Sequence, residues 1–150
     1  MDDQEWMQQA LQMASRARDR GEIPVGALVV RDGVLLGAGH NLRQVRRDPL
    51  AHAEIVALRR AARRLGDWRL EGCAVYVTLE PCPMCVGALL AARVSRLIYA
   101  ASNPQAGAAG SVINLADYPG MKNRIRVRSG VLEEQATRLL GEFFDELRGR

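Results

Sequence analysis

The stretch TLEPCPMCVGAL, residues 78–89, holds two of the chain's three cysteines, Cys82 and Cys85, at C-x-x-C spacing. The apolar segment before it, residues 73–79, predicts a strand, and Pro81 predicts the start of a helix. Residues three apart in a helix share a face, so both thiols are expected to point the same way. A helix N-terminus favours thiolates, which a metal site and a redox pair both require. The spacing alone therefore leaves both interpretations open.

The rest of the chain shows no internal repeat or linker and predicts a single domain over residues 1–150. The turn around Asp32-Gly33 separates two apolar segments and predicts a hairpin. Strands that then alternate with helices indicate an α/β sandwich around a five-stranded mixed sheet, with an antiparallel pair at one edge. The predicted strands are 25–30, 34–39, 73–79, 97–101 and 124–128, and the predicted helices are 3–20, 49–65, 81–93, 112–118 and 131–148.

The composition is that of a soluble globular protein, with 48% hydrophobic and 25% charged residues. No apolar run approaches the ~20 residues that span a membrane, so we expect no membrane contact. Three cysteines with this spacing do not suggest a disulfide framework, and we expect a reducing, cytoplasmic location. The net charge is +4, and every basic residue except Lys122 is an arginine. Arginine suits phosphates but also solvated helix faces, so the charge alone leaves nucleic-acid binding open.

Few side chains outside the C-x-x-C pair could complete a metal site. Cys73 begins the preceding strand, and seven steps of ~3.3 Å put it ~20 Å from the strand's far end. We therefore predict that Cys73 is a buried core thiol. His40, in the segment GHN, could lie near the site or cap a loop.

His52 is the remaining candidate ligand, and Glu54 follows it two residues later. Asp48-Pro49 supplies a cap residue and a first-turn proline, so the sequence predicts a helix that starts there and runs to about Leu65. If this helix start and that of the cysteines face one crevice at the sheet edge, one histidine and two cysteines meet, with no fourth ligand evident. Such open sites are typical of catalytic zinc, which lowers the pKa of its water. We predict one zinc ion per subunit, bound by His52, Cys82 and Cys85, with Glu54 as the catalytic proton carrier.

His52-Ala53-Glu54 and Pro81-Cys82-Pro83-Met84-Cys85 together form the signature of the zinc-dependent cytidine/deoxycytidylate deaminase superfamily. Within it, the chain most resembles the bacterial tRNA-specific adenosine deaminases. The segments that carry this resemblance are EIPVGALVV, GHN, DPLAHAEIVAL, YVTLEPCPMCVGAL, AGAAGSVINL and GVLEEQATRLLGEFFDEL.

The resemblance implies a three-layer, cytidine-deaminase-like α/β/α sandwich and a homodimer. It also implies hydrolytic deamination of adenosine to inosine at the wobble position of a tRNA anticodon, by zinc-activated water with a glutamate proton shuttle. An enzyme of this kind is a hydrolase that acts on carbon–nitrogen bonds of cyclic amidines.

Substrate contacts follow from the same resemblance. Asn41 is expected to hydrogen-bond the purine, and the residues expected to line the base pocket are Ile23, Pro24, Val25 and Ala51. Asn103 and Gln105 stand where many relatives have an acidic residue and a lysine that touch the nucleotide, and Lys122-Asn123 stands where Asn-His is common. An acidic side chain at position 103 would repel phosphates, and a 2′-OH can satisfy it where deoxyribose cannot. Because Asn103 is neutral and can donate or accept, the penalty against DNA should be smaller, and we expect weak but detectable activity on single-stranded DNA.

Contacts to the RNA backbone are expected from basic and polar side chains near the pocket mouth. Three arginines precede the helix that bears His52 and should lie on a loop beside the pocket. The expected backbone contacts are Arg43, Arg46, Arg47, Gln105 and Lys122. Arg59, Arg60, Arg63 and Arg64 lie more than ~10 Å further along that helix, which favours a solvated face or a subunit contact.

Three other functions are compatible with parts of the pattern. A deaminase of a free base or nucleoside, such as cytidine or guanine, shares the same signature. The arginines and Phe143-Phe144 favour a polymeric substrate, although two aromatics in an amphipathic helix are typical of a core. A nucleic-acid-binding module with structural zinc leaves the acid beside an open metal position unexplained. A thiol oxidoreductase leaves His52 and Glu54 without a role.

Overall fold

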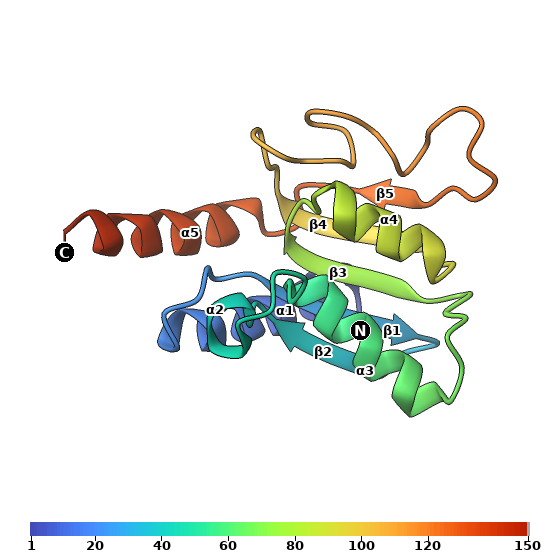
Figure 1. Cartoon of the computed structure of the whole chain (residues 1–150), viewed down its shortest axis with the longest axis horizontal. Coiled ribbons are helices and arrows are strands. Elements are labelled where there is room, and N and C mark those ends of the chain that lie inside the picture. The colour runs from blue at the N-terminus through green and yellow to red at the C-terminus, as the bar shows by residue number, and fades with distance from the viewer. Residues whose placement is uncertain (150) are drawn as a thin grey trace.

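Five strands form one mixed sheet in the computed structural model, which describes residues 1–149 (Figure 1). β1 runs antiparallel to both β2 and β3, whereas β3, β4 and β5 run parallel to one another. The predicted five-stranded mixed sheet is confirmed, and the reversed strand is β1. In spatial order the strands are β2 (Val34–His40), β1 (Gly26–Arg31), β3 (Ala74–Leu79), β4 (Arg96–Ala101) and β5 (Arg126–Arg128).

The hairpin between β1 and β2 turns at the two residues that the sequence indicates. Asp32 and Gly33 both have positive φ, 51° and 74°, the conformation of a two-residue turn whose twist matches the flanking strands. Arg31 and Val34 pair directly across it. This hairpin places one edge of the sheet at β2.

Helices cover both faces of the sheet, which confirms the predicted α/β/α layers (Figure 1). One face carries α1 (Asp3–Asp19) and α5 (Glu133–Arg148), and the other carries α3 (Ala53–Leu65) and α4 (Pro83–Ala91). A separate core lies on each face. A one-turn helix, α2 (Arg43–Arg46), follows β2 where the sequence predicted a loop.

The helix α3 packs closely on β2, because the strand has glycines where the helix crosses it. A Cβ added at Gly37 would lie 2.5 Å from the carbonyl oxygen of Ala57, and one at Gly39 would lie 2.9 Å from that of Ala53. Real side chains do not tolerate such distances, so these two positions let the helix backbone rest on the strand. The strand therefore determines where the N-terminus of α3 lies.

Two predicted elements differ from the structure near the C-terminus. The helix predicted at 112–118 does not form, because its backbone bonds go to the preceding loop: the N–H of Leu115 donates to the carbonyl of Ala108 at 2.8 Å. Two β-branched residues, Val112 and Ile113, also disfavour a helix there. The strand predicted at 124–128 is shorter and comprises only β5.

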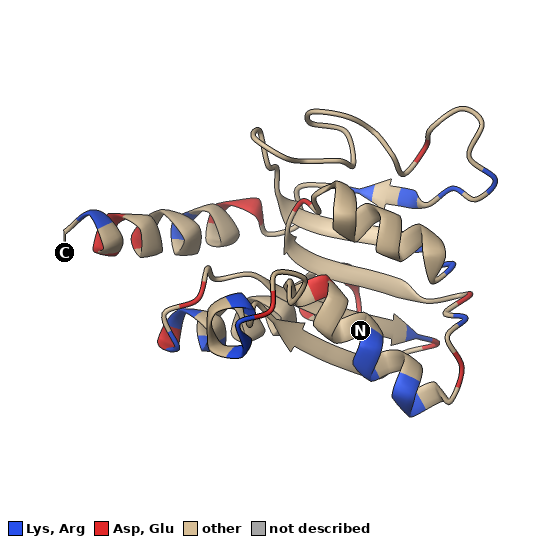
Figure 2. Ribbon diagram, viewed as in Figure 1, with Lys and Arg blue, Asp and Glu red and all other residues tan. Residues whose placement is uncertain are grey.

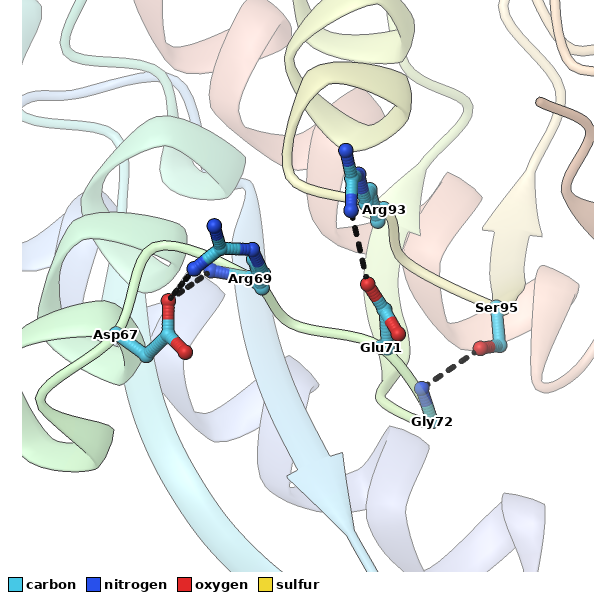
Figure 3. Close-up of polar contacts among 6 residues, drawn as sticks. All are labelled: Asp67, Arg69, Glu71, Gly72, Arg93 and Ser95. Atoms are coloured by element: carbon cyan, nitrogen blue, oxygen red, sulfur yellow. Dashed lines mark hydrogen bonds and ion pairs between the residues drawn. The ribbon is translucent and has the colours of Figure 1, made fainter. Parts of the chain in front are cut away.

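The connection from α3 to β3 lies at the end of the sheet opposite to Cys82 and is held by side-chain contacts (Figure 3). Arg69 bonds to Asp67, Arg93 bonds to Glu71 at 3.1 Å, and the Ser95 hydroxyl accepts from the N–H of Gly72 at 2.9 Å. The guanidinium groups of Arg69 and Arg93 also lie over the ring of Trp68, at 4.7 and 5.1 Å. These contacts hold a half-exposed tryptophan in place.

Basic residues gather on α2, on the later turns of α3 and on β5 (Figure 2). Within residues 1–149, no helix combines the length and the apolar character that crossing a membrane requires.

Asp3 joins the start of α1 to three strands. Its carboxylate accepts hydrogen bonds from the Tyr76 hydroxyl at 2.6 Å, from Arg128 at 2.6 Å and from Arg96 at 3.1 Å. Burial alone would raise the pKa of Asp3, but the bonds from Tyr76 and the arginines outweigh it and hold the pKa below its usual value.

We predict that Asp3→Asn lowers the free energy of unfolding by about 1–2 kcal/mol at pH 7, because charge-assisted hydrogen bonds are removed. The folded pKa lies below the unfolded value of about 3.9, so the contribution is present above that pH and disappears as the pH falls through the folded pKa. Urea unfolding from pH 7 to pH 3 should show the two proteins converging. Asp19→Asn, at the exposed other end of α1, is the control. A difference that persists unchanged at pH 3 would contradict this role for Asp3.

Candidate active site

His52 occupies the N-cap of α3, immediately before the first helical residue, Ala53. The prediction that this helix starts at Asp48-Pro49 is wrong. The Asp48 carboxylate instead accepts a hydrogen bond from the N–H of Leu50 at 2.9 Å and closes a turn two residues before His52. His52 has an extended backbone (φ −66°, ψ 155°), so it lies at the helix end and not in the first turn.

The two cysteines meet His52 from the start of α4. Cys82 is the N-cap of α4 and Pro83 is its first residue, so the predicted start at Pro81 is two residues early. Proline suits this first position because its missing N–H has no partner to lose. The Nδ1 of His52 lies 3.7 Å from the Sγ of Cys82 and 3.4 Å from the Sγ of Cys85, which sits in the first turn.

These three side chains form a metal-binding triad, with their ligand atoms all within 4.8 Å of one another. The pKa of Cys82 is lowered to about 4, mainly by a hydrogen bond with Cys85. The same hydrogen bond is the main reason that the pKa of Cys85 is raised. The hydrogen bond with Cys82 raises the pKa of His52. Two sulfurs and an imidazole nitrogen thus face one point and are linked by shared protons. A metal cation that binds there releases these protons. In the described part of the chain no fourth such ligand joins the cluster, so the site is open.

Glu54 lies beside the triad in the first turn of α3, and only 4% of its surface is exposed. Burial raises the pKa of its carboxyl above the usual value. His52 is two residues away, and the two side chains share one pocket because the site lies off the helix end.

A cavity of about 100 Å³ opens above the triad and Glu54. The sequence predicts six substrate-binding residues, namely Asn41, Ile23, Pro24, Val25, Ala51 and Asn103. Of these, Ile23, Val25, Asn41 and Asn103 line the cavity, together with Arg43, Ala53, Leu79 and Glu80. Their contacts to a substrate remain predictions.

The other predicted contact residues lie outside the cavity wall. Pro24 does not line it, and Ala51 is buried in a small cluster with Leu42 and Val56. Arg46, Arg47 and Gln105 are exposed on α2, at its C-cap and on the loop after β4. Lys122 lines a separate hollow with Glu71 and Arg93, at the opposite end of β3.

The other two candidate ligands do not join the triad. Cys73 is buried in the core beneath α3 and α4, as predicted, and burial raises the pKa of its thiol. His40 is buried at the end of β2, where its Nδ1 lies 3.1 Å from the carbonyl oxygen of Asn41.

Sequence reasoning missed Glu80, which directly follows β3, between Leu79 and Pro81. It is only 1% exposed and lines the cavity. Burial would raise the pKa of its carboxyl, but hydrogen bonds from Ser111 and from three backbone N–H groups lower it. The sequence signal that could have identified Glu80 is an acidic residue directly before Pro81-Cys82, at the carboxyl end of a buried strand.

A second hollow of about 290 Å³ adjoins the cavity and shares Ile23, Asn41 and Arg43 with it. Its far wall is the last half of α5, where Phe143 is buried and Phe144 is 40% exposed. Both residues of the Phe143-Phe144 pair thus line this hollow next to the site, one buried and one partly exposed.

The fold and the triad are those of a deaminase. The model of the MafB19-like deaminase family matches residues 1–148. The tRNA-specific adenosine deaminase of Bacillus subtilis is 42% identical over 146 residues, which are 97% of this chain and 91% of the relative. A solved structure from work on A-to-I editing by tRNA:A34 deaminases at the wobble position of transfer RNA has a TM-score of 0.88 and 39% identity, and covers 91% of this chain and 99% of its own. Guanine deaminase from Bacillus subtilis has a TM-score of 0.67 and 32% identity, with 100% and 96% covered.

The chain therefore belongs to the MafB19-like deaminase family and, within it, to the tRNA-specific adenosine deaminases.

Metal content should separate Cys82 from Cys73. We predict about one tightly held metal ion per chain in the wild type and in Cys73→Ala, and its loss in Cys82→Ala. Of these two cysteines, only Cys82 belongs to the triad. Elemental analysis after gel filtration gives the readout, and circular dichroism checks that both variants fold. Equal metal loss from the two variants would contradict the assignment of the triad.

Proposed function

We propose that the protein hydrolytically deaminates adenosine to inosine at the wobble position of a tRNA anticodon, with one zinc ion per subunit. The observation that carries this proposal is the buried Glu54 beside an open metal-binding triad, in a chain that belongs to this family. Two thiols and an imidazole are a donor set that fits zinc, which accepts sulfur and nitrogen ligands in tetrahedral sites. When bound, zinc supplies the Lewis acidity that makes a water molecule nucleophilic near neutral pH.

The residues of the chain handle the proton and the base. Glu54 takes one proton of the attacking water and transfers it to the purine ring nitrogen. It then takes the second proton, from the hydroxyl that has added to carbon 6, and delivers it to the departing amine, so that adenosine and water become inosine and ammonia. Its burial excludes bulk water that would otherwise compete for these protons. In this proposal Asn41, which lines the cavity, hydrogen-bonds the base, while Ile23 and Val25 supply apolar surface against its ring.

The adjoining hollow supports a polymeric substrate over a free base. The cavity above Glu54 shares Ile23, Asn41 and Arg43 with the neighbouring hollow, which offers further space beside Arg43 and Phe144 for nucleotides that flank the target base. An exposed aromatic ring and a guanidinium that line one hollow can receive an unstacked nucleobase and its phosphate.

Product analysis on an anticodon stem-loop tests the proposal. We expect inosine at the wobble position, no conversion of free adenosine, cytidine or guanine at comparable enzyme concentration, and weak conversion of the single-stranded DNA equivalent because Asn103 is neutral. Conversion of free guanine without conversion of the stem-loop would establish the guanine deaminase alternative instead.

Glu54→Ala should retain zinc and fold but lose nearly all turnover of the stem-loop, by about 100-fold or more, because the proton carrier is removed while the ligands remain. Single-turnover rates and metal content measured on the same preparation separate the two effects. Substantial residual turnover would exclude Glu54 as the proton shuttle.

We propose that the RNA backbone lies along α2 and not along α3. Arg43 lines both hollows, and Arg46 and Arg47 are exposed next to it. On α3, by contrast, Arg60 and Arg64 donate to the carbonyls of Ala38 and Leu35 in the edge strand β2, at 2.9 and 2.5 Å.

Replacement of Arg46 and Arg47 by alanine should therefore weaken RNA binding and flatten its salt dependence, by a slope of about 0.7 for each phosphate that the protein no longer neutralises. Turnover at saturating RNA should change little. The control removes the same charge from α3, in Arg63→Ala with Arg64→Ala. If the α3 variant flattens the slope and the α2 variant does not, the proposed path of the RNA is wrong.

We also propose that the protein is a homodimer through the face between α3 and α4. An apolar hollow there is lined by Ile55, Leu58, Arg59, Ala62, Trp68, Leu70, Ala88, Ala91 and Ala92. Small alanines allow the close approach of another helix, and Trp68, a half-exposed residue of the same lining, offers a large apolar side chain to it. An apolar surface of this kind can pack against the same surface of a second copy, as a twofold interface requires.

Ala88→Arg should convert the dimer to a monomer in sedimentation velocity, because a charge enters the centre of the proposed contact. Gln8→Arg, on the exposed side of α1, adds the same charge to the other face and should leave the dimer intact. A monomeric wild type, or a dimer unaffected by Ala88→Arg, would contradict this interface.

A further inference from the structure

The buried carboxylate of Glu80 has no part in the proton transfers above, yet it stands at the wall of the same cavity. Its hydrogen-bond partners all come from one loop, residues 102–111, which follows β4. Oε1 accepts from the N–H of Asn103 at 3.1 Å and from the Ser111 hydroxyl. Oε2 accepts from the N–H groups of Ala109 and Ser111, at 3.0 and 3.1 Å.

This set of partners excludes Glu80 as a second proton carrier. An ionised carboxylate offers about four lone-pair positions, and four donors from the loop occupy them. No acceptor capacity remains for a proton of the water or the base. The side chain is therefore engaged in holding the loop.

The loop in turn is folded tightly around the carboxylate. A Cβ added at Gly107 would lie 2.5 Å from both Cδ and Oε2 of Glu80 and 2.5 Å from the carbonyl oxygen of Asn103. Only a residue without a side chain allows the loop to approach this closely. Glycine at this position and the carboxylate of Glu80 therefore depend on each other.

The anchored loop carries one residue of the cavity wall, Asn103. The side-chain oxygen of Asn103 accepts from the N–H groups of Gln105 and Ala106, at 3.2 and 3.1 Å, so its orientation is coupled to the turn of the loop. The N–H of the same residue donates to Glu80. Backbone and side chain of Asn103 are thus both held, one by Glu80 and the other by the loop that Glu80 organises.

We propose that Glu80 is a positioning residue for substrate: its buried carboxylate anchors the loop 102–111 and thereby holds Asn103 at the wall of the active-site cavity. This inference rests on the proposed function, since it assigns part of the nucleotide affinity to a group that contacts no reacting atom. Because Glu80 also directly precedes Pro81-Cys82, one short segment supplies both a metal ligand and the anchor of the substrate wall.

Glu80→Gln tests the proposal with little change in shape. The amide nitrogen cannot accept, so at least one pair of loop donors faces another donor and the loop is released. We expect KM for the stem-loop to rise about tenfold and kcat to fall less than about threefold, with zinc content unchanged. Glu134→Gln, an exposed residue of α5, should leave all three quantities unchanged. A large loss of kcat at unchanged KM, or a loss of zinc, would overturn the proposal.

A double-mutant cycle shows whether Glu80 acts through Asn103. Asn103→Ala alone should raise KM, and in the Glu80→Gln background it should add much less than its effect in the wild type. Additive effects would mean that Glu80 does not work through that residue.

Hydrogen exchange separates this inference from the proposed function, because it requires no activity. The amides of Asn103, Ala109 and Ser111 should exchange at least about tenfold faster in Glu80→Gln, since one of the two accepting oxygens becomes an amide nitrogen and the loop is released. The amide of Ala108, which donates to the carbonyl of Pro81 at 2.8 Å, is an internal reference and should change less. Unaltered exchange at the three amides would refute the anchor even if the wild type deaminates RNA. If the anchor is present but no stem-loop is converted, the proposed function fails instead.

Discussion

Two helix N-termini meet at the carboxyl end of β3, and the candidate site depends on this meeting. His52 and Cys82 are the N-caps of α3 and α4, so their side chains lie off the helix ends, where the partial positive charge of each helix favours thiolate and carboxylate groups. Cys85 and Glu54 follow in the first turns. A ligand set divided between two helices exists only if both helices are held rigidly against the sheet.

Close packing on the sheet provides that rigidity. The approach of α3 to β2 over Gly37 and Gly39 is too tight for any larger residue, so the position of His52 is determined by backbone contact and not by adjustable side chains. The start of α4 follows β3 directly through Glu80 and Pro81. The carboxylate of Glu80 then joins this point to the loop 102–111, so the metal ligands and one wall of the cavity share a single support.

The chemistry of the site could be predicted from the sequence, because it depends on residue types and local spacing. Histidine, two cysteines and a glutamate at two helix starts are sufficient to indicate an open metal site with a proton carrier. The predicted starts of both helices, at Asp48 and Pro81, are too early. A capping residue or a proline can belong to a turn just before the helix as well as to the helix itself, and the local sequence does not distinguish the two. The missing helix at 112–118 and the role of Glu80 have a common cause. Both depend on hydrogen bonds between segments distant in sequence, which local patterns do not contain.

X-ray absorption at the zinc edge of the purified protein measures the central feature most directly, namely the open triad. The account predicts two sulfur ligands at about 2.3 Å and lighter ligands at about 2.0–2.1 Å, with both sulfurs retained in Cys73→Ala. A coordination shell with three or more sulfur atoms, or one that loses a sulfur in Cys73→Ala, would contradict it.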